Sequence, residues 1–219
     1  MTNLNSTTHL GTYIVHSACG ELKVTSMPHK QCDKTTDQYC QTFSEALLDK
    51  DTNQHLLGFD KGTLAARDAH IVVAETSCGK FLGGLHCQTS GDHLWLRGAV
   101  VKPLFRGNRI GATMAATGLV HAHTSNVSLP TPVCSIRVYS DGSENVASRK
   151  TFERLGFQAH ADINQVYLNL DQSDRHRKST AERDAQGSYY TLSRKLYGTA
   201  RVYDIARNFL ADWTKREAE

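Results

Sequence analysis

The chain has 219 residues, a length that suits one ordinary domain with a sizeable core, or one domain with an appendage. Hydrophobic residues make up 39% of the sequence, and no run approaches the roughly 18 apolar residues of a membrane helix, so the sequence does not suggest a membrane protein. The net charge of +3 is too small to favour nucleic acid as a partner. The N-terminal MTNLNSTTHLG lacks the pattern of a secretion signal, and we expect a cytoplasmic protein.

The cysteines indicate neither a disulfide scaffold nor a metal site. None of the six forms a C-x-x-C pair, and the chain is long for a disulfide-dependent fold. The spacing of His29, Cys32 and Cys40 matches no zinc pattern. We therefore expect free, mostly buried thiols and no metal.

The predicted elements alternate between strands and helices along the first 170 residues. Short apolar stretches predict strands at 13–15 and 22–27, and a helix starts near Asp33 or Thr36 with Tyr39, Phe43 and Leu47 at helical spacing. A short helix is expected over 64–68. Further along, strands are predicted over 70–76, 81–88, 93–101, 133–139 and 166–170, and helices over 108–125 and 143–155.

The last fifty residues differ in composition from the rest. Residues 171–187 are strongly charged and nearly free of apolar side chains, which predicts a linker over 171–190 between a domain over 1–170 and a C-terminal helical extension over 191–219. Large apolar residues in that extension, such as Leu196, Tyr203 and Leu210, favour a helix that covers the core or a second subunit. A homodimer is therefore possible.

The stretch VVKPLFRGNRIGATM, residues 100–114, runs from a strand through a basic, glycine-bearing loop into a helix. Backbone N–H groups at a helix N-terminus have no partner within the helix and lie at the positive end of its dipole. Glycines before the helix let these groups approach a ligand, and Arg106 and Arg109 add positive charge. The stretch therefore predicts a phosphate site, or else a tight turn with solvated arginines. Neither G-x-x-x-x-G-K-[ST] nor G-x-G-x-x-G occurs.

Two segments resemble the GNAT superfamily of N-acetyltransferases. Residues 101–112, VKPLFRGNRIGA, are similar to its acyl-CoA-binding pattern V-x-P-x-x-[QR]-x-x-G-x-[GA]. Residues 145–157, NVASRKTFERLGF, are similar to the pattern N-x-x-A-x-x-L-Y-x-x-x-G-F. The resemblance covers roughly residues 69–170 and implies an α/β (α+β) fold, in which a mixed central sheet splays between the strand before the loop and the next strand.

The resemblance also implies a co-substrate, acetyl-CoA, whose pantetheine arm pairs with the first of the two splayed strands. Asn145 is expected near that arm, or else as a helix cap. The positions implied to hold coenzyme A are Ala99, Val100, Val101, Arg106, Gly107, Asn108, Arg109, Ile110, Gly111, Ala112, Asn145, Ser148 and Phe152.

Two departures from the family patterns bear on the chemistry. Arg109 stands where the family has glycine, so we expect a loop conformation that tolerates a side chain, from which the arginine would reach the phosphates. Phe152 stands where the family has a tyrosine that is proposed to protonate the departing thiolate, which phenylalanine cannot do. Another group, water, or no dedicated acid then serves that step.

Candidates for catalysis are few. The resemblance implies that bases lie on the strand before the loop and face the acceptor, and alternation along this strand gives the set His93, Trp95, Arg97, Ala99 and Val101. His93 and Glu75 are candidate bases and Tyr139 a candidate acid, each weighed against a surface or packing role. In the cleft, Arg97 would bind a carboxylate of the acceptor, with Trp95 beside it; otherwise it pairs with a nearby acid.

The sequence thus predicts acetyl transfer from acetyl-CoA to a primary amine by direct attack in a ternary complex, with a small-molecule acceptor such as an amino acid. A non-catalytic acyl-CoA-binding sensor or scaffold is the alternative, because of Phe152 and the missing carboxylate. An acetyltransferase that acts on protein or RNA is a third possibility. No cysteine is assigned as a nucleophile.

Overall fold

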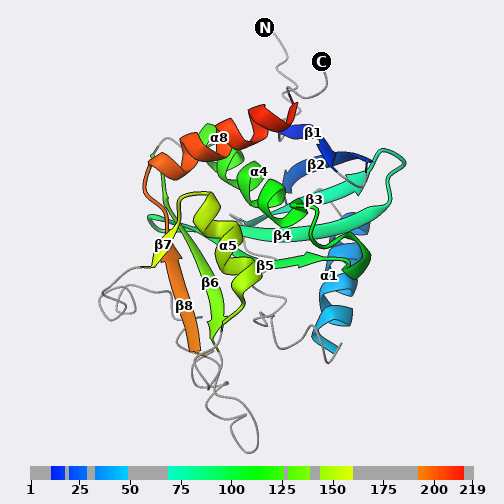
Figure 1. The fold of residues 1–219 in the computed structure, drawn as a ribbon, viewed down its shortest axis with the longest axis horizontal. Coiled ribbons are helices and arrows are strands. Elements are labelled where there is room, and N and C mark those ends of the chain that lie inside the picture. Colours follow the sequence, from blue (N-terminus) through cyan, green and yellow to red (C-terminus); the bar gives the residue numbers. More distant parts are fainter. Residues whose placement is uncertain are drawn as a thin grey trace, which may run out of the picture.

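A computed structural model describes residues 11–17, 20–28, 33–48, 69–125, 128–138, 144–159 and 192–214. Its strands form one mixed sheet in the order β1-β2-β3-β4-β5-β6-β8-β7 (Figure 1). The strands are β1 (Thr12–Ser17), β2 (Gly20–Pro28), β3 (Ala69–Thr76), β4 (Phe81–Ser90), β5 (His93–Val101), β6 (Thr131–Val138), β7 (Gln158–Ala159) and β8 (Leu192–Tyr197). The helices are α1 (Asp33–Leu48), α4 (Ile110–Ser125), α5 (Val146–Arg154) and α8 (Arg201–Thr214).

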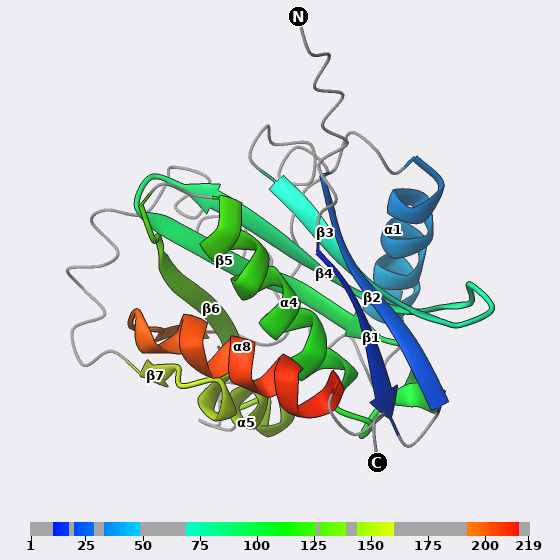
Figure 2. The same cartoon turned by 90° about the horizontal axis from the view of Figure 1, so that it is seen from above.

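Helices cover both faces of the sheet. Helix α4 lies along one face with α8 beside it, and α1 lies on the other (Figure 2). Nearly every side chain of α4 between Ile110 and Val120 is buried, as expected for a helix packed between a sheet and other helices. The larger core contains α4, α8 and one set of strand residues, and a smaller core contains Tyr39 and Phe43 of α1 with the other set.

Strands β5 and β6 form the parallel pair of the sheet, and they separate along their length. Their register begins at His93 opposite Thr131 and ends at Leu96 opposite Cys134, although both strands continue. Beyond this point β6 turns away from β5 (Figure 1). The predicted splay between the strand before the loop and the next strand is therefore confirmed, and the ladder between β5 and β6 ends at Leu96 and Cys134.

A β-bulge interrupts β5 at the start of the splayed part. In the ladder with β4, Gly84 faces Val100 and His86 faces Arg97, so β5 carries one extra residue at Gly98 and Ala99. Gly98 has φ 62°, a conformation that glycine adopts without steric cost.

The bulge also reverses the alternation of β5. Val100 packs with Tyr39 on the α1 face, and Val101 lies against the larger core on the α4 face. We predicted that one face of the strand carries His93, Trp95, Arg97, Ala99 and Val101. This is wrong beyond Arg97, because side chains alternate between the two faces and one extra residue moves those that follow to the opposite face.

The C-terminal segment corrects a second prediction. Residues 192–197 form β8, which pairs with β6 from Val133 opposite Tyr197 to Val138 opposite Leu192, so the helix does not begin at 191 but at Arg201. The strand β8 forms because its main chain pairs with the edge of β6, and no local pattern in the sequence indicates this pairing. Gly198 donates to the carbonyl of Pro132 and ends the strand. Val202, Tyr203, Ala206 and Leu210 of α8 then complete the larger core.

The other predicted elements agree with the structure to within a few residues, except those outside the described part. The helix over 64–68, the strand over 166–170 and the linker over 171–190 lie outside the described residues, so the division into domains stays a prediction. Within the described residues, no helix combines the length and the apolar character needed to cross a membrane.

Candidate functional site

The loop between β5 and α4 is built around two residues in the left-handed backbone region. A single 3-10 turn covers Pro103–Phe105, then Gly107 has φ 82° and Arg109 has φ 59°. The Asn108 amide donates to the carbonyls of Phe105 at 3.2 Å and Arg106 at 3.3 Å, which holds the loop closed on itself. The Asn108 side chain therefore stabilises the loop itself.

The loop ends at the open N-terminus of α4. Arg109 caps the helix, because its carbonyl accepts from the amide of Thr113 at 3.0 Å. The amides of Ile110, Gly111 and Ala112 then have no carbonyl one turn earlier, and within the described residues none of them donates to another backbone carbonyl. A Cβ added at Gly107 or Gly111 would contact nothing within 4 Å. The amides therefore border open space rather than packed side chains, which is the geometry of an anion site.

Arg109 has a left-handed backbone, with φ 59°, at the position where the family motif has glycine. A left-handed φ costs a residue with a Cβ roughly 1 kcal/mol. Arginine at this position therefore takes a conformation that glycine adopts at lower cost.

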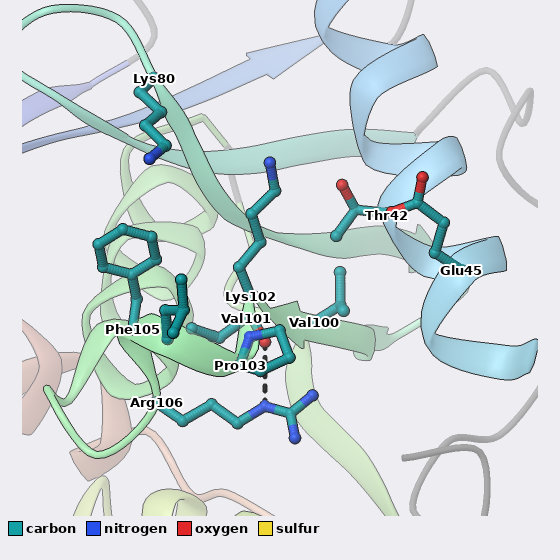
Figure 3. Close-up of a pocket in the computed structure, with 10 residues that line it drawn as sticks. Thr42, Glu45, Lys80, Val100, Val101, Lys102, Pro103, Phe105 and Arg106 are labelled. Atoms are coloured by element: carbon teal, nitrogen blue, oxygen red, sulfur yellow. Dashed lines mark hydrogen bonds between the residues drawn. The ribbon is translucent and has the colours of Figure 1, made fainter. Parts of the chain in front are cut away.

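Arg106 lies beneath the end of β5. Its Nε donates to the carbonyl of Val101 at 3.1 Å (Figure 3). One main-chain acceptor of the predicted pantetheine-binding strand is thus bonded by the protein itself, and this bond fixes the Arg106 side chain at the end of β5.

Helix α5 carries the second family motif, which the structure places mainly in capping and packing. The Asn145 side chain accepts from the amide of Ser148 at 3.1 Å and caps the helix, which was one of the two roles expected for it. Phe152 is buried and meets Phe157 edge-on at 5.3 Å between ring centroids. A contact of either residue with coenzyme A remains a prediction.

Tyr39, which the sequence indicated only as an apolar position of α1, contacts the bulge. It is fully buried, and its hydroxyl donates to the carbonyl of Gly98 at 2.8 Å. Its ring also lies against Gly84, where an added Cβ would come within 2.4 Å of the ring. Burial raises the pKa of the Tyr39 hydroxyl well above its usual value, so it remains a hydrogen-bond donor. Only its spacing from Phe43 was visible in the sequence.

The three candidates on the first half of β5 lie on the α1 face. Trp95 is buried with Val133, and the Arg97 guanidinium lies 5.1 Å from the Trp95 ring centroid. Arg97 faces the buried His86 of β4 in the ladder. His93 lies at the start of the strand, where β5 and β6 are still paired, about 13 Å along the strand from Arg97.

The remaining candidates are remote or undescribed. Glu75 lies opposite Lys23 and Phe81 near the end of β3, and β4 separates that strand from β5, about 10 Å away in all. Tyr139 lies outside the described residues. The structure therefore does not bring Glu75 and His93 together, since they lie on non-adjacent strands. Within the described residues, no three His, Cys, Asp or Glu side chains form a group that could hold a metal ion.

A cavity of about 340 Å³ opens between α1, the β3–β4 turn and the loop after β5 (Figure 3). Thr42 and Glu45 of α1 line one side, Lys80 lines another, and Lys102 lies between them. Val100, Val101 and Pro103 supply the apolar part of its surface. Arg106 also lines the cavity and was singled out from the sequence, whereas Thr42, Glu45, Lys80 and Lys102 were not, because they come from three separate segments.

No protein-family model matches the sequence, and no curated protein matches it. Solved structures do match the fold. An acyl-CoA N-acyltransferase from Pseudomonas aeruginosa aligns with a TM-score of 0.54 and 12% identity over 81% of this chain and 99% of its own. The chain has the GNAT acyltransferase fold.

Two further solved structures share this GNAT fold. A GNAT-family acetyltransferase from Staphylococcus aureus Mu50 aligns with a TM-score of 0.51 and 9% identity, over 80% of this chain and 98% of its own. The N-acetylglutamate synthase from Neisseria gonorrhoeae, complexed with coenzyme A and N-acetyl-glutamate, aligns with a TM-score of 0.51 and 13% identity over 80% of this chain and 34% of its own. At these identities the likeness establishes the fold.

Proposed function

We propose that this protein is an N-acetyltransferase that moves an acetyl group from acetyl-CoA to a primary amine in a ternary complex. The observation that carries the proposal is the combination of unpartnered amides at Ile110–Ala112 with a splayed β5 that ends beside them. The fold shared with the Neisseria protein, whose structure contains coenzyme A, supports the same donor.

The described residues fit coenzyme A chemically. The α4 amides and the guanidinium of Arg106 would hold the diphosphate, because both donate to anionic oxygens. Main-chain groups in the splayed part of β5, past the end of its ladder with β6, would pair with the amides of the pantetheine arm. Arg109, beside the same amides, adds positive charge. Acetyl-CoA supplies the activated acetyl group when it is bound.

The chain contributes positioning rather than a covalent nucleophile. The amine nitrogen bonds to the acetyl carbon, the carbon–sulfur bond breaks, and the amine proton leaves with the thiolate or with water. Main-chain donors near the bulge would stabilise the charge that develops on the carbonyl oxygen. Tyr39 fixes this part of β5 through Gly98, so it is a positioning residue. We assign no cysteine as a nucleophile. Cys87 and Cys134 are buried, and Cys78 lies on the β3–β4 turn.

A single observation favours the alternative, an acyl-CoA-binding protein without transferase activity. Phe152 is packed against Phe157 at the position where the family has its acid, so α5 supplies no proton donor there. Thiolates leave readily without general acid assistance, and for this reason we favour the enzyme. Acceptors such as protein or RNA depend on segments that include the charged residues 171–190, outside the described residues.

The experiment that separates these functions measures binding and turnover together. Calorimetry with coenzyme A is expected to show a saturable site, and acetyl-CoA is expected to be consumed with one amine of a broad panel. Saturable binding without consumption would favour the sensor. Absence of any affinity for coenzyme A would contradict both functions, because each depends on the same loop amides.

A further inference from the structure

The cavity beside α1 has a strong imbalance of charge. Lys80, Lys102 and Arg106 line it, whereas Glu45 is the carboxylate in its lining. The chain as a whole carries 25 basic and 22 acidic residues, so this excess does not follow from composition. A concave surface lined by one sign of charge raises the local concentration of ligands of the opposite sign.

The two lysines are held in place by aromatic rings. The Nζ atom of Lys80 lies 5.4 Å from the ring centroid of Phe105, and Nζ of Lys102 lies 5.7 Å from that of Phe81. Among the described residues no carboxylate lies within 4 Å of either ammonium group. Both charges are thus oriented at the cavity without being neutralised by a described acidic residue.

Helix α1 presents a polar stripe to the same place. Gln38, Gln41, Thr42 and Glu45 recur at helical spacing and line a second hollow of about 290 Å³, which shares Thr42, Glu45, Lys80 and Lys102 with the first. The Gln41 amide donates to Glu45 at 2.9 Å and orients its carboxylate. The wall opposite the lysines therefore offers one negative charge and several hydrogen-bonding groups.

The cavity adjoins the part of β5 at which we place the acetyl group. Tyr39, which bonds the bulge through Gly98, precedes Thr42 by less than one helical turn of α1, a rise of about 5 Å. An amine held at Glu45 and Thr42 would therefore lie on the α1 face of β5, alongside the splayed strand. The volume of about 340 Å³ suits a small molecule rather than a long polymer.

We propose that this cavity binds an acceptor that carries an anionic group, carboxylate or phosphate, close to its amine. Lys80 and Lys102 hold the anionic group, and Glu45 holds the ammonium before it loses a proton. This proposal rests on the acetyltransferase function proposed above and adds the chemical class of the acceptor. It also places the recognition in residues other than Arg97, whose guanidinium lies on the Trp95 ring.

Matched amines test the proposal. Glycine is compared with glycinamide, and phosphoethanolamine with ethanolamine, so that each pair differs in the anionic group and the two pairs separate carboxylate from phosphate. We expect the anionic member of at least one pair to show a kcat/KM about 10-fold higher, and Lys102→Met or Lys80→Met to remove most of that preference through KM. Lys150→Met, which removes an exposed lysine of α5, is the control and is expected to leave activity unchanged.

Binding measurements keep the two proposals distinguishable. Calorimetry with phosphoethanolamine or glycine, in the presence of coenzyme A, is expected to show binding that Lys102→Met abolishes, while the affinity for coenzyme A stays within 2-fold. Such binding without turnover would support the cavity proposal and contradict the transferase. Acetylation of neutral amines with no preference for anionic ones would overturn the cavity proposal alone. A loss of coenzyme A affinity in both lysine variants would also overturn it, because the cations would then serve the co-substrate.

Discussion

The two faces of β5 show different ways of building a binding site. On the α4 face and around the following loop, the groups offered to a ligand are main-chain amides at Ile110–Ala112 and the main chain in the splayed part of β5. On the α1 face, they are side chains from three segments, including Glu45, Lys80 and Lys102.

This difference explains why one half of the site could be predicted from the sequence and the other half could not. A main-chain site requires particular backbone conformations, so glycines, a proline and a helix start must follow one another at fixed spacing. A side-chain site requires only that suitable groups meet in space. The predictions below test whether the two halves are as separate in function as they are in construction.

The largest effect is expected at Gly111. A Cβ there meets nothing within 4 Å, and leucine forms helices better than glycine does, so Gly111→Leu should not lower the free energy of unfolding. The new side chain should nevertheless cover the amides and raise the Kd for coenzyme A by about 100-fold or more. Isothermal titration calorimetry and denaturant unfolding measure the two quantities.

Gly118 of the same helix provides the matched control. An added Cβ would lie 2.8 Å from Cys87 Sγ in the core, so Gly118→Ala should destabilise the fold without acting on the loop. Unchanged coenzyme A affinity in Gly111→Leu would show that the helix N-terminus is not the diphosphate site.

Tyr39→Phe tests whether α1 positions the bulge. Loss of one buried hydrogen bond should cost about 1 kcal/mol in the free energy of unfolding, and kcat should fall about 10-fold while the Kd for coenzyme A stays constant. Tyr203→Phe is the control, because its buried hydroxyl also donates to a backbone carbonyl, that of Pro130, away from the bulge. Equal kcat in the two variants would reduce Tyr39 to a packing residue.

Arg97→Ala tests a second location for the acceptor's anionic group. If Arg97 contributes, KM for an anionic amine should rise up to about 5-fold, with little change in KM for acetyl-CoA. Comparing the KM of this variant for the anionic amine with that of Lys102→Met then shows which part of the α1 face binds the anionic group. If both values of KM stay constant and only the free energy of unfolding falls, Arg97 serves its contact with Trp95.

His70 makes the stability of the α4 face depend on pH. It is buried, its ring lies 4.7 Å from that of His121, and its Nε2 has no hydrogen-bond partner among the described residues. Burial first, then the neighbouring His121 and His86, lower its pKa from 6.5 to about 3. The unfolded chain therefore takes up a proton below pH 6.5 that the folded chain does not.

The free energy of unfolding should then fall as the pH drops below 6.5, by up to about 1.4 kcal/mol per pH unit for one proton. Denaturant unfolding between pH 7.5 and 5 should show a shallower slope for His70→Leu than for the wild type. Parallel slopes would mean that other groups account for the loss.

The smallest effect is expected at Arg109. Glycine adopts φ 59° without cost, so Arg109→Gly should raise the free energy of unfolding by about 1 kcal/mol and Tm by about 2–4 °C. The affinity for coenzyme A should fall, because one cation beside the diphosphate is lost. A variant that is more stable and binds equally well would assign no ligand role to this arginine.

Sequence patterns and local chemistry determined much of this protein. The loop over 103–109, the helix after it and the strands over 70–101 are set by β-branched runs, turn residues and helical spacing, which act over a few residues. The departure at Arg109 was likewise visible, although only the structure showed that the backbone stays left-handed there.

Tertiary structure decided the remainder. The bulge at Gly98 and Ala99 arises from pairing with β4 and moves Val100 to the α1 face, and β8 forms because β6 offers a free edge. The contact of Tyr39 with Gly98 joins residues 59 apart, and the cavity joins α1, a turn and a loop. Such features depend on which distant segments come into contact, and the spacing of residues along the sequence does not indicate those contacts.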